Sequence, residues 1–584
     1  MATDNQVQEI VHRLEEGRWK KWVQLAALVA TVIALFAAFI FDPLYWGLFK
    51  GLSHPKAMEQ AEIAREIARG NGFTTKMIRP VVLAQFQRNR NSTSTELMPD
   101  TYHAPAWPMT LAPFLNAIKS KWTMSTRDYV YAPDRMIAAV ATVFFLLSVL
   151  VNYFTMRRLF DHQLAILTVG LLLICDLFWK FSLSGLPQMM MAFLFSGALF
   201  FMVRAVENRT QERPFMGWLL AAASLFGLLA LTHALSIWIF AGALFFCGFY
   251  FKPRIRTILL MTGVFLLVYS PWLVRTYHVA GTLSDPLGIA PYSGLFQIRG
   301  TESEIMRGGA VDFGGVSPTM FRNKIQNQVS SHLGSLFSRL GQSWVAPLFF
   351  IALMHLFKRR DTGQVRWLIL SMWLFAAFGM AAFGSDDPAG ELGANDLDPL
   401  FIPLFSAYGL AFLLVMWTRL EIHVTLLRIA FLSLLFIGSA IPLVNTFTCG
   451  NKGVVQWPPY VPPYIAILGT WTSDQELIAS DMPWAVAWYA DRKSIWLPKS
   501  VQSFIDLNDY ERLGGRIVGL YLTPFSGNRA FISEIVKGEY KEWAPFILRT
   551  ANVKDFPLKS VTALPIDNQC IFYSDHDRWT DRMD

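Results

Sequence analysis

One short stretch of the sequence gathers acidic side chains that could hold a cation or a sugar. Within residues 384–399, Asp396-Leu397-Asp398 forms an Asp-x-Asp pair. In soluble sugar-nucleotide enzymes such a pair holds a metal, because carboxylate oxygens are good ligands for hard divalent cations. The stretch therefore predicts a divalent-cation site or an acceptor site, and the alternative is a turn that is acidic only because it excludes Lys and Arg. Its acids are Asp386, Asp387, Glu391, Asp396 and Asp398.

A second pair of ionisable residues lies inside an apolar stretch. Asp176 and Lys180 are four positions apart, and ionisable side chains within membrane segments commonly mark functional sites. The same spacing also lets the two side chains pair along one helix, and we favour this ion pair. The sequence contains no P-loop, no His-Glu-x-x-His and no nucleotide-binding glycine fingerprint, which argues against ATP-driven transport and zinc hydrolysis.

The composition indicates that these residues belong to a membrane protein. The 584 residues are 53% hydrophobic and only 16% charged, whereas an average globular chain carries about 25% charged residues. The net charge of +8 could indicate a nucleic-acid partner, but Lys and Arg also collect at the cytoplasmic ends of membrane helices. We favour the second interpretation and expect no nucleic-acid partner. The charge is still too high for spans alone, so some part must lie in water.

Apolar runs close to the length that crosses a bilayer, about 20 residues, recur along the first three quarters of the chain. We predict a polytopic α-helical membrane domain over residues 1–444 with about eleven spans. The predicted spans are 22–41, 136–156, 164–181, 188–203, 216–232, 235–251, 257–274, 344–357, 367–383, 400–417 and 424–444.

The distribution of Lys and Arg orients these spans. With a cytoplasmic N-terminus, the predicted inner segments hold basic clusters such as Arg157-Arg158, while the short outer turns 182–187, 233–234 and 384–399 hold none. This is the positive-inside pattern. We therefore expect a multi-pass protein of the plasma (inner) membrane, with its N-terminus in the cytoplasm and its C-terminus outside.

Three segments on the predicted outer side are too long to be turns. They are a first outer loop at 42–135, a second outer loop at 275–343 and a C-terminal segment at 445–584. Long loops usually carry function, so we expect the working face of the protein to be the outer one.

The C-terminal segment 445–584 is predicted to be an extracytoplasmic α/β domain, because short apolar strands alternate with helical stretches. Asp481 lies two residues before Pro483 and is predicted to be the N-cap of a helix. Cys449 and Cys570, near the two ends of the segment, predict a disulfide bond, with two free thiols as the alternative. The predicted strands are 476–480, 494–497, 516–522 and 570–573.

A helical stretch lies near the start of the first outer loop. Residues 56–69 (KAMEQAEIAREIAR) repeat apolar residues at helical spacing, and Gly70 and Gly72 follow as a stop. An amphipathic helix just outside a span can lie along the membrane interface. We predict such an interfacial helix, either with a functional role or as a plain structural element.

Three short motifs in the loops resemble those of a known superfamily. EIAREIARGNGF at 62–73, HAPAWP at 103–108 and SPWLVRTYHVAG at 270–281 are similar, in order and placement, to stretches of the GT-C superfamily of polyprenyl-phosphate-sugar-dependent glycosyltransferases. The branch it most resembles is the protein O-mannosyltransferase and aminoarabinose-transferase type. The resemblance implies a GT-C-like membrane domain, a polyprenyl-phosphate-sugar donor, and an acceptor (protein, lipid or glycan) on the outer, periplasmic face.

The resemblance also implies a catalytic base. Family members carry an acid several residues before Ile-Ala-Arg, in the register where this sequence has Lys56-Ala57. Glu59, in Ala-Met-Glu-Gln-Ala, resembles a substitute acid, and Asp42 is the fallback. Such a carboxylate would take the proton of the acceptor hydroxyl in an inverting transfer.

Cationic side chains would hold the leaving phosphate and stabilise its developing charge. The candidates are Lys76, Arg79 and Arg275, each of which could instead contact lipid headgroups. His103 is a candidate for binding the acceptor sugar or the phosphate, although it could equally cap a loop. We expect no cofactor other than a divalent cation at the acidic turn, if that turn binds one.

Two other functions are compatible with the sequence. The absence of an acid at Lys56-Ala57 favours a catalytically silent GT-C-like relative that serves as a structural or assembly subunit. A secondary transporter is the third reading, but the large outer domain and the lack of evident repeated halves argue against it.

Overall fold

The computed structural model describes most of the chain beyond the first predicted span. Span 22–41, Asp42 and Cys449 lie outside the described residues, as do three acids of the acidic turn (Asp386, Asp387 and Glu391). Apart from a few single positions, the described ranges are 49–83, 97–125, 130–281, 302–308, 317–384, 392–420, 425–448, 461–509, 515–527, 531–552, 556–564 and 570–579.

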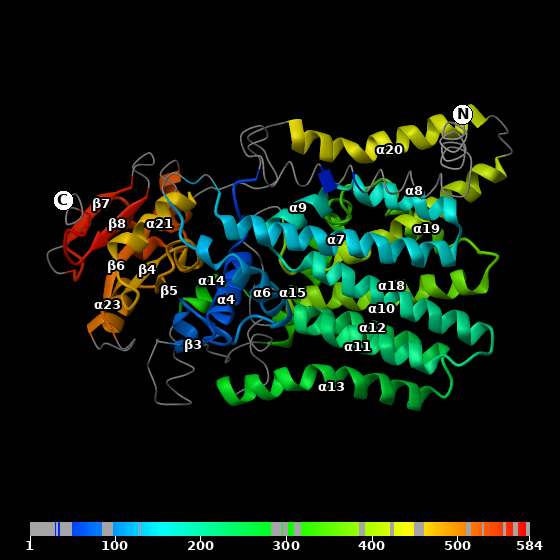
Figure 1. The fold of residues 1–584 in the computed structure, drawn as a ribbon, viewed down its shortest axis with the longest axis horizontal. Helices are drawn as coiled ribbons and strands as arrows, with labels where there is room; N and C mark the ends of the chain where they lie inside the picture. The colour runs from blue at the N-terminus through cyan, green and yellow to red at the C-terminus, as the bar shows by residue number, and fades with distance from the viewer. Residues whose placement is uncertain are drawn as a thin grey trace, which may run out of the picture.

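Long apolar helices form a bundle, and the loops and the C-terminal strands gather at one end of it, called the loop end below (Figure 1). Among the described residues, six helices are long and apolar enough to cross a membrane, or seven if one bent pair counts as a span. The six are α7 (Ala132–Leu159), α10 (Gln188–Thr210), α13 (Arg254–Ala280), α18 (Arg360–Phe383), α19 (Ile402–Arg419) and α20 (Thr425–Thr448). Shorter apolar helices are α11 (Met216–Thr232) and the continuous η2–α12 (Ala234–Ser236 and Ile237–Tyr250).

The predicted count of eleven spans is not confirmed, and two of the predicted runs differ in form. The run 164–181 is a bent pair, α8 (His162–Leu173) and α9 (Asp176–Ser184), with an angle of 55° between them. The run 344–357 holds only α17 (Leu348–Ala352) as helix. The Ser343 hydroxyl accepts from two following backbone N–H groups, a local arrangement that competes with a helix.

Small residues let the helices of the bundle approach closely. Helix α10 lies inside the bundle, with 72% of its apolar 18-residue stretch buried. The corresponding stretches of α13 and α20 are 22% and 6% buried, and these two helices form the edges of the bundle. At Gly242 in α12, an added Cβ would lie 2.6 Å from the Cα of Met372 in α18. Such backbone contact is how helices associate where no water drives apolar surfaces together.

The C-terminal segment forms a six-stranded sheet that takes its edge strand from the first long loop. Strand β2 of that loop pairs parallel with β5, and the sheet order is β2-β5-β4-β6-β8-β7. The four predicted strands are confirmed, and each observed end lies within one residue of the predicted one. Strands β2 and β7 were not predicted. The strands are β2 (Met77–Ile78), β4 (Leu477–Ser480), β5 (Lys493–Trp496), β6 (Ile517–Leu522), β7 (Ser560–Ala563) and β8 (Ile571–Ser574).

Asp481 does not cap a helix as predicted. Pro483 begins the short α22 (Pro483–Ala485), which continues as a π-helix over Val486–Ala490. The Asp481 carboxylate turns instead to the end of β6, where it accepts hydrogen bonds from the backbone and hydroxyl groups of Thr523 and Ser526. It therefore ties the ends of β4 and β6 together.

Helix α4 (Pro55–Arg69) confirms the predicted helix and its stop at Gly70. It is not interfacial, because residues 57–66 are all buried among α6 (Ala106–Ala117), β1 (Thr74–Thr75) and α22. Its charged side chains find partners inside the protein, as shown below. The Cys570 side chain is buried; because Cys449 lies outside the described residues, the disulfide stays a prediction.

The remaining elements connect these parts. In the loops they are β3 (Met98–Pro99), η1 (Lys119–Lys121), α14 (Glu302–Met306), α15 (Pro318–Gly334), α16 (Leu336–Arg339) and η4 (Asp398–Leu400). In the C-terminal domain they are α21 (Pro462–Trp471), α23 (Val501–Asp509), α24 (Pro524–Gly527), α25 (Ile532–Lys537), η8 (Lys541–Trp543) and α26 (Ala544–Ile547). The division into domains at residues 444 and 445 stays a prediction.

Candidate functional site

Helix α4 carries Glu59 and is fixed at both ends. Its N-cap residue His54 has an extended backbone and accepts a hydrogen bond from the Lys56 N–H at 3.1 Å. Pro55 occupies the first turn, where a missing N–H costs nothing. Gly70 ends the helix with φ at +90°, a left-handed conformation that glycine adopts without strain. Glu59 therefore projects from a helix whose start and end are both defined.

A small antiparallel strand pair, β1 with β3, positions the residues opposite Glu59. Arg275, near the end of α13, fastens this pair from the side. Its guanidinium donates to the carbonyl oxygens of Asp100 at 2.6 Å and Phe73 at 3.0 Å, and it lies 4.6 Å from the ring centroid of Trp272. Arg275 thus contacts the backbone beside Glu59's partners and links the β1–β3 pair to α13.

Glu59, Arg79, Asp100 and His103 form a closed cluster of four ionisable side chains. The Glu59 carboxylate pairs with Arg79, and its Oε2 lies 2.8 Å from His103 Nε2. On the other side of the imidazole, Nδ1 lies 3.3 Å from Asp100 Oδ1, which is also 3.9 Å from Arg79 Nη1. The Arg79 guanidinium stacks 4.2 Å from the ring centroid of Tyr102. Each acid therefore contacts both basic side chains.

The four side chains are between 3% and 5% exposed, so their charges depend on one another. Burial alone would raise the pKa of Glu59, but Arg79 and His103 outweigh it and hold that pKa below its ordinary value. Burial alone would lower the pKa of His103, but Asp100 and Glu59 raise it. The neighbouring charges therefore favour the ionised form of Glu59 and the protonated form of His103.

The cluster leaves little room beside it. A hollow of about 10 Å³ is lined by residues including Arg79, Asp100 and Tyr102, and this volume is about the minimum that one water molecule needs. In the present arrangement this hollow is too small to hold a sugar or a phosphate.

Lys76 is directed away from this cluster. It joins Arg65 and Arg69 around Asp491, which follows the π-helix of the C-terminal domain. Lys76 Nζ lies 2.7 Å and Arg65 Nη2 3.1 Å from Asp491 Oδ1, while Arg69 donates to both carboxylate oxygens. Arg65 also donates to the carbonyls of Trp488 and Ala487. We call Asp491 and its three cationic partners the Asp491 clamp.

Sequence reasoning missed Asp100, Asp134 and Asp491. Asp100 had a local signal, because an Asp that accepts from the N–H groups two and three residues on, here Tyr102 and His103, forms a common turn. Asp134 accepts from Trp488 Nε1 at 2.8 Å and from the Tyr489 hydroxyl at 3.0 Å. The side-chain partners of Asp134 and Asp491 are hundreds of positions away, so no local pattern marks either residue.

The Asp-x-Asp pair is engaged by protein side chains. Asp396 lies 3.4 Å from Arg339, and Asp398 accepts from Trp373 Nε1 at 2.9 Å and lies 3.4 Å from His332. In the part of the chain that the structure describes, no group of three or more His, Cys, Asp or Glu could hold a metal ion. The predicted ion pair of Asp176 and Lys180 is confirmed, with 3.0 Å between Oδ2 and Nζ.

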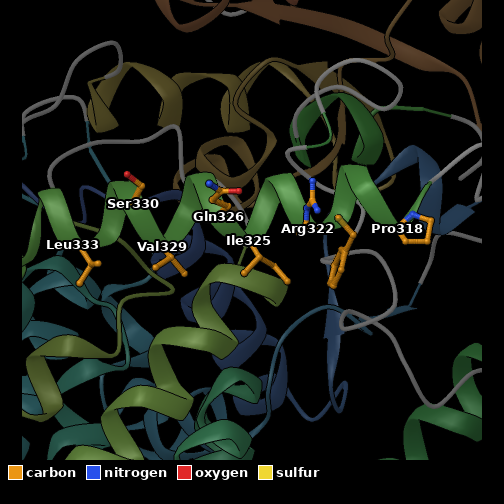
Figure 2. Close-up of a pocket in the computed structure, with 8 residues that line it drawn as sticks. Pro318, Arg322, Ile325, Gln326, Val329, Ser330 and Leu333 are labelled. Atoms are coloured by element: carbon orange, nitrogen blue, oxygen red, sulfur yellow. The ribbon is translucent and has the colours of Figure 1, made fainter.

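Helix α15 of the second long loop lines an open, largely apolar groove of about 600 Å³. Figure 2 shows Ile325, Val329 and Leu333 pointing to one side of this helix. Their spacing of four residues places them in one row. The groove therefore offers apolar side chains over several turns, which suits a long hydrocarbon chain.

Comparison of the whole chain with solved structures identifies its fold. The oligosaccharyltransferase AglB from Archaeoglobus fulgidus, in complex with an inhibitory peptide and a dolichol-phosphate, matches with a TM-score of 0.52 at 13% identity, over 91% of this chain and 73% of AglB. ArnT from Cupriavidus metallidurans, bound to undecaprenyl phosphate, matches with a TM-score of 0.51 at 13% identity, over 95% of this chain and 98% of ArnT. The chain has the GT-C fold. No protein-family model matches it, and no curated protein sequence is similar to it.

The GT-C fold of this chain covers both the bundle and the C-terminal segment, since the match to ArnT spans nearly all of both chains. At this level of identity the likeness concerns the arrangement of the elements. Within that arrangement, α4 contributes Glu59 to the cluster with Arg79, Asp100 and His103. The same helix contributes Arg65 and Arg69 to the Asp491 clamp.

Proposed function

We propose that the protein is a membrane glycosyltransferase that moves a sugar from a polyprenyl-phosphate donor to an acceptor on the outer (periplasmic) face. The observation that carries the proposal is the fold, because the similar structures include one with a dolichol-phosphate and one bound to undecaprenyl phosphate. The acceptor class, whether protein, lipid or glycan, is left open; one similar oligosaccharyltransferase structure is tethered to an acceptor peptide.

The proposed base is Glu59. A phosphate leaving group already activates the donor sugar, so the protein must deprotonate the acceptor hydroxyl and stabilise the leaving phosphate. An ionised Glu59 can accept the hydroxyl proton, and His103 at 2.8 Å can bind the acceptor or the phosphate. Arg79 and Arg275 are proposed to contact the phosphate once the loop after β3 has moved, and Lys76 once it has left Asp491. This movement would exchange their present partners for the substrate.

The proposed site of the lipid tail is the groove along α15. Its row of Ile325, Val329 and Leu333 provides an apolar surface that a polyprenyl chain can follow. A polyprenyl chain gains free energy roughly in proportion to the apolar area that it buries, about 25 cal/mol per Å².

A second candidate function is a catalytically silent subunit of a membrane complex. Two observations favour it. Lys56 occupies the register of the family acid, and Glu59 is buried between Arg79 and His103, as a purely structural carboxylate would be. In that case the cluster would serve only to hold α4 against the β1–β3 pair.

The experiment that separates the two is sugar transfer by the full chain in nanodiscs. The donors are labelled polyprenyl-phosphate sugars, and a membrane extract supplies acceptors. Glu59→Gln should lower kcat by about 10²-fold or more if Glu59 is the base, while Glu59→Asp should retain part of the rate. Glu476→Gln removes a partly exposed carboxylate that pairs with Arg578 and is the matched control, which should transfer like the wild type.

The transfer rates can be interpreted unambiguously when donor binding and thermal stability are measured on the same samples. Equal rates for the wild type and Glu59→Gln would exclude Glu59 as the base. Binding of a polyprenyl phosphate without transfer of any sugar tested would favour the silent subunit. A loss of both binding and stability in Glu59→Gln would make its rate uninformative, and Glu59→Asp, which keeps the charge, then decides.

A further inference from the structure

Helix α6 of the first long loop has an apolar side that remains exposed. Met109 and Phe114 are 53% and 43% exposed, and Pro113 between them is exposed as well. Large apolar side chains gathered on one side of a helix are costly in water, about 25 cal/mol for each Å² of apolar surface. Because the fold is that of membrane proteins, lipid is one candidate for covering these side chains.

The opposite side of α6 is seated on the loop end of the bundle. Trp107 is fully buried, donates from Nε1 to the carbonyl of Gly185 at 3.0 Å, and contacts the ring of Phe144 with 6.2 Å between centroids. The Thr110 hydroxyl lies 3.7 Å from Met190 Sδ at the start of α10. These contacts place α6 against α7, the end of α9 and the start of α10, at the loop end of the bundle.

The surface of α7 next to this seat is apolar and exposed, as expected for a surface that faces lipid. Val143, the neighbour of Phe144, is 55% exposed, and Leu147 and Leu150 continue the exposed apolar side of α7 toward the other end of the bundle. Because α6 packs against Phe144, it lies at the level where the exposed apolar surface of α7 begins. An apolar helix side at that height can enter the headgroup region.

Basic and aromatic residues follow α6 directly. Lys119 and Lys121 of η1 are exposed, and Lys119 Nζ lies 5.8 Å from the ring centroid of Trp122. The Trp122 indole donates to the carbonyl of Leu115 at 3.2 Å, so this ring is anchored to the end of α6. A row of apolar side chains, then lysines and a tryptophan is the pattern of a segment lying in a membrane interface.

We propose that the α6 surface, made of Met109, Pro113, Phe114, Lys119 and Lys121, binds the leaflet at the loop end of the bundle. The apolar residues enter the headgroup region and the two lysines contact anionic lipid phosphates. This role goes beyond the proposed sugar transfer and does not depend on it. It would also hold the first long loop, and with it α4, at a fixed height above the membrane.

The first test measures the depth of position 114. Phe114→Cys, labelled with an environment-sensitive fluorophore in the full chain, is placed in nanodiscs containing brominated phosphatidylcholine. The matched control is Val561→Cys on strand β7, whose side chain is similarly exposed at 45%. We expect bromolipid to quench the label at 114 at least about twofold more than the label at 561, because interfacial helices bury their apolar side by about 5–10 Å.

Two outcomes would overturn the proposal. One is a label at 114 that aqueous iodide quenches as strongly as the label at 561. The other is a label shielded from both iodide and bromolipid, which would mean that a second copy or another protein covers α6. Unlabelled-site background is subtracted with the wild-type chain, whose described cysteines are all buried.

The second test concerns the headgroup. Bromine carried on phosphatidylglycerol in a phosphatidylcholine background should quench the label at 114 more than bromine on phosphatidylcholine in a phosphatidylglycerol background. The double variant Lys119→Gln/Lys121→Gln should remove this preference, and added salt should weaken it. Equal quenching by the two brominated lipids in the wild type would contradict the role of the lysines.

Discussion

Replacing Asp491 by Asn should loosen the edge of the C-terminal sheet without unfolding the bundle. Asp491 adopts a left-handed backbone with φ at +56°, which Asn tolerates better than most residues. The substitution therefore removes the negative charge of the Asp491 clamp and keeps the shape of the side chain. Lys76 is adjacent to β2, so the loss of its carboxylate partner acts directly on the pairing of β2 with β5.

The expected free-energy cost of Asp491→Asn follows from how deeply the side chains of the Asp491 clamp are buried. Arg65 is fully buried, while the Asp491 side chain is 30% exposed. Removing one partner of a fully buried pair costs about 3–5 kcal/mol, but partial exposure screens the charges and Asn still accepts a hydrogen bond. We expect about 2 kcal/mol, equivalent to about 30-fold faster opening of β2, since 1.4 kcal/mol is a factor of ten.

Hydrogen exchange followed by mass spectrometry in nanodiscs measures this opening. Peptides covering residues 74–79 and 493–496 should exchange about 30-fold faster in Asp491→Asn, while peptides from α7 should not change. Glu476→Gln, at another ion pair of the same domain, is the control for charge loss. Unchanged exchange at 74–79 in a folded Asp491→Asn protein would refute the reasoning.

The same clamp should respond to acid. Burial alone would raise the pKa of Asp491, but Arg65, Arg69 and Lys76 hold it below its ordinary value. A lowered folded-state pKa contributes stability that is present above the unfolded pKa of about 3.9 and is lost as the pH falls through the folded value. Wild-type exchange at 74–79 should therefore approach that of Asp491→Asn only below about pH 4.

Three further changes test other parts of the structure. The raised pKa of His103 means that its contribution is full below the unfolded pKa of about 6.5 and is lost as the pH rises through the folded value; His103→Gln should flatten this alkaline decline in a thermal unfolding series. Burial and the neighbouring Glu66 raise the pKa of Glu62 to about 8, so wild-type stability should fall as the pH rises from about 4 toward 8, and Glu62→Gln should remove that slope. Gly242→Ala places a Cβ 2.6 Å from the Cα of Met372 and should cost about 1–3 kcal/mol by forcing α12 from α18, seen as a lower unfolding temperature than that of Gly217→Ala, where an added Cβ meets nothing within 4 Å.

Elements with a strong local pattern were predictable from the sequence. The helix 56–69 with its stop at Gly70 and the four central strands of the C-terminal domain match the structure because spacing and glycine placement decide them locally. The prediction of a span at 344–357 was wrong because hydropathy carries no information about the turn that Ser343 and Pro347 form at its start. The prediction that helix 56–69 lies along the membrane interface was wrong, because the partners that bury its charged side chains lie elsewhere in the chain.

The candidate site divides in the same way. Glu59, Arg79 and His103 come together although they were chosen separately, while Lys76 joins a different acid. Nothing near Lys76 in the sequence marks that choice, since Asp491 is 415 positions away. Tertiary partners of buried charges depend on the whole topology, which local patterns do not contain.

The strand that the first long loop lends to the C-terminal sheet has a consequence for biogenesis. Lys76 and Asp491 are separated by 415 positions, so β2 is synthesised long before β5, the strand that it must pair with. Until the last part of the chain has been synthesised, β2 lacks its partner strand β5, and Arg65, Arg69 and Lys76 lack Asp491. The newly made bundle therefore holds an unpaired strand edge until β5 is made, and a chain truncated before β5 would keep that edge unpaired.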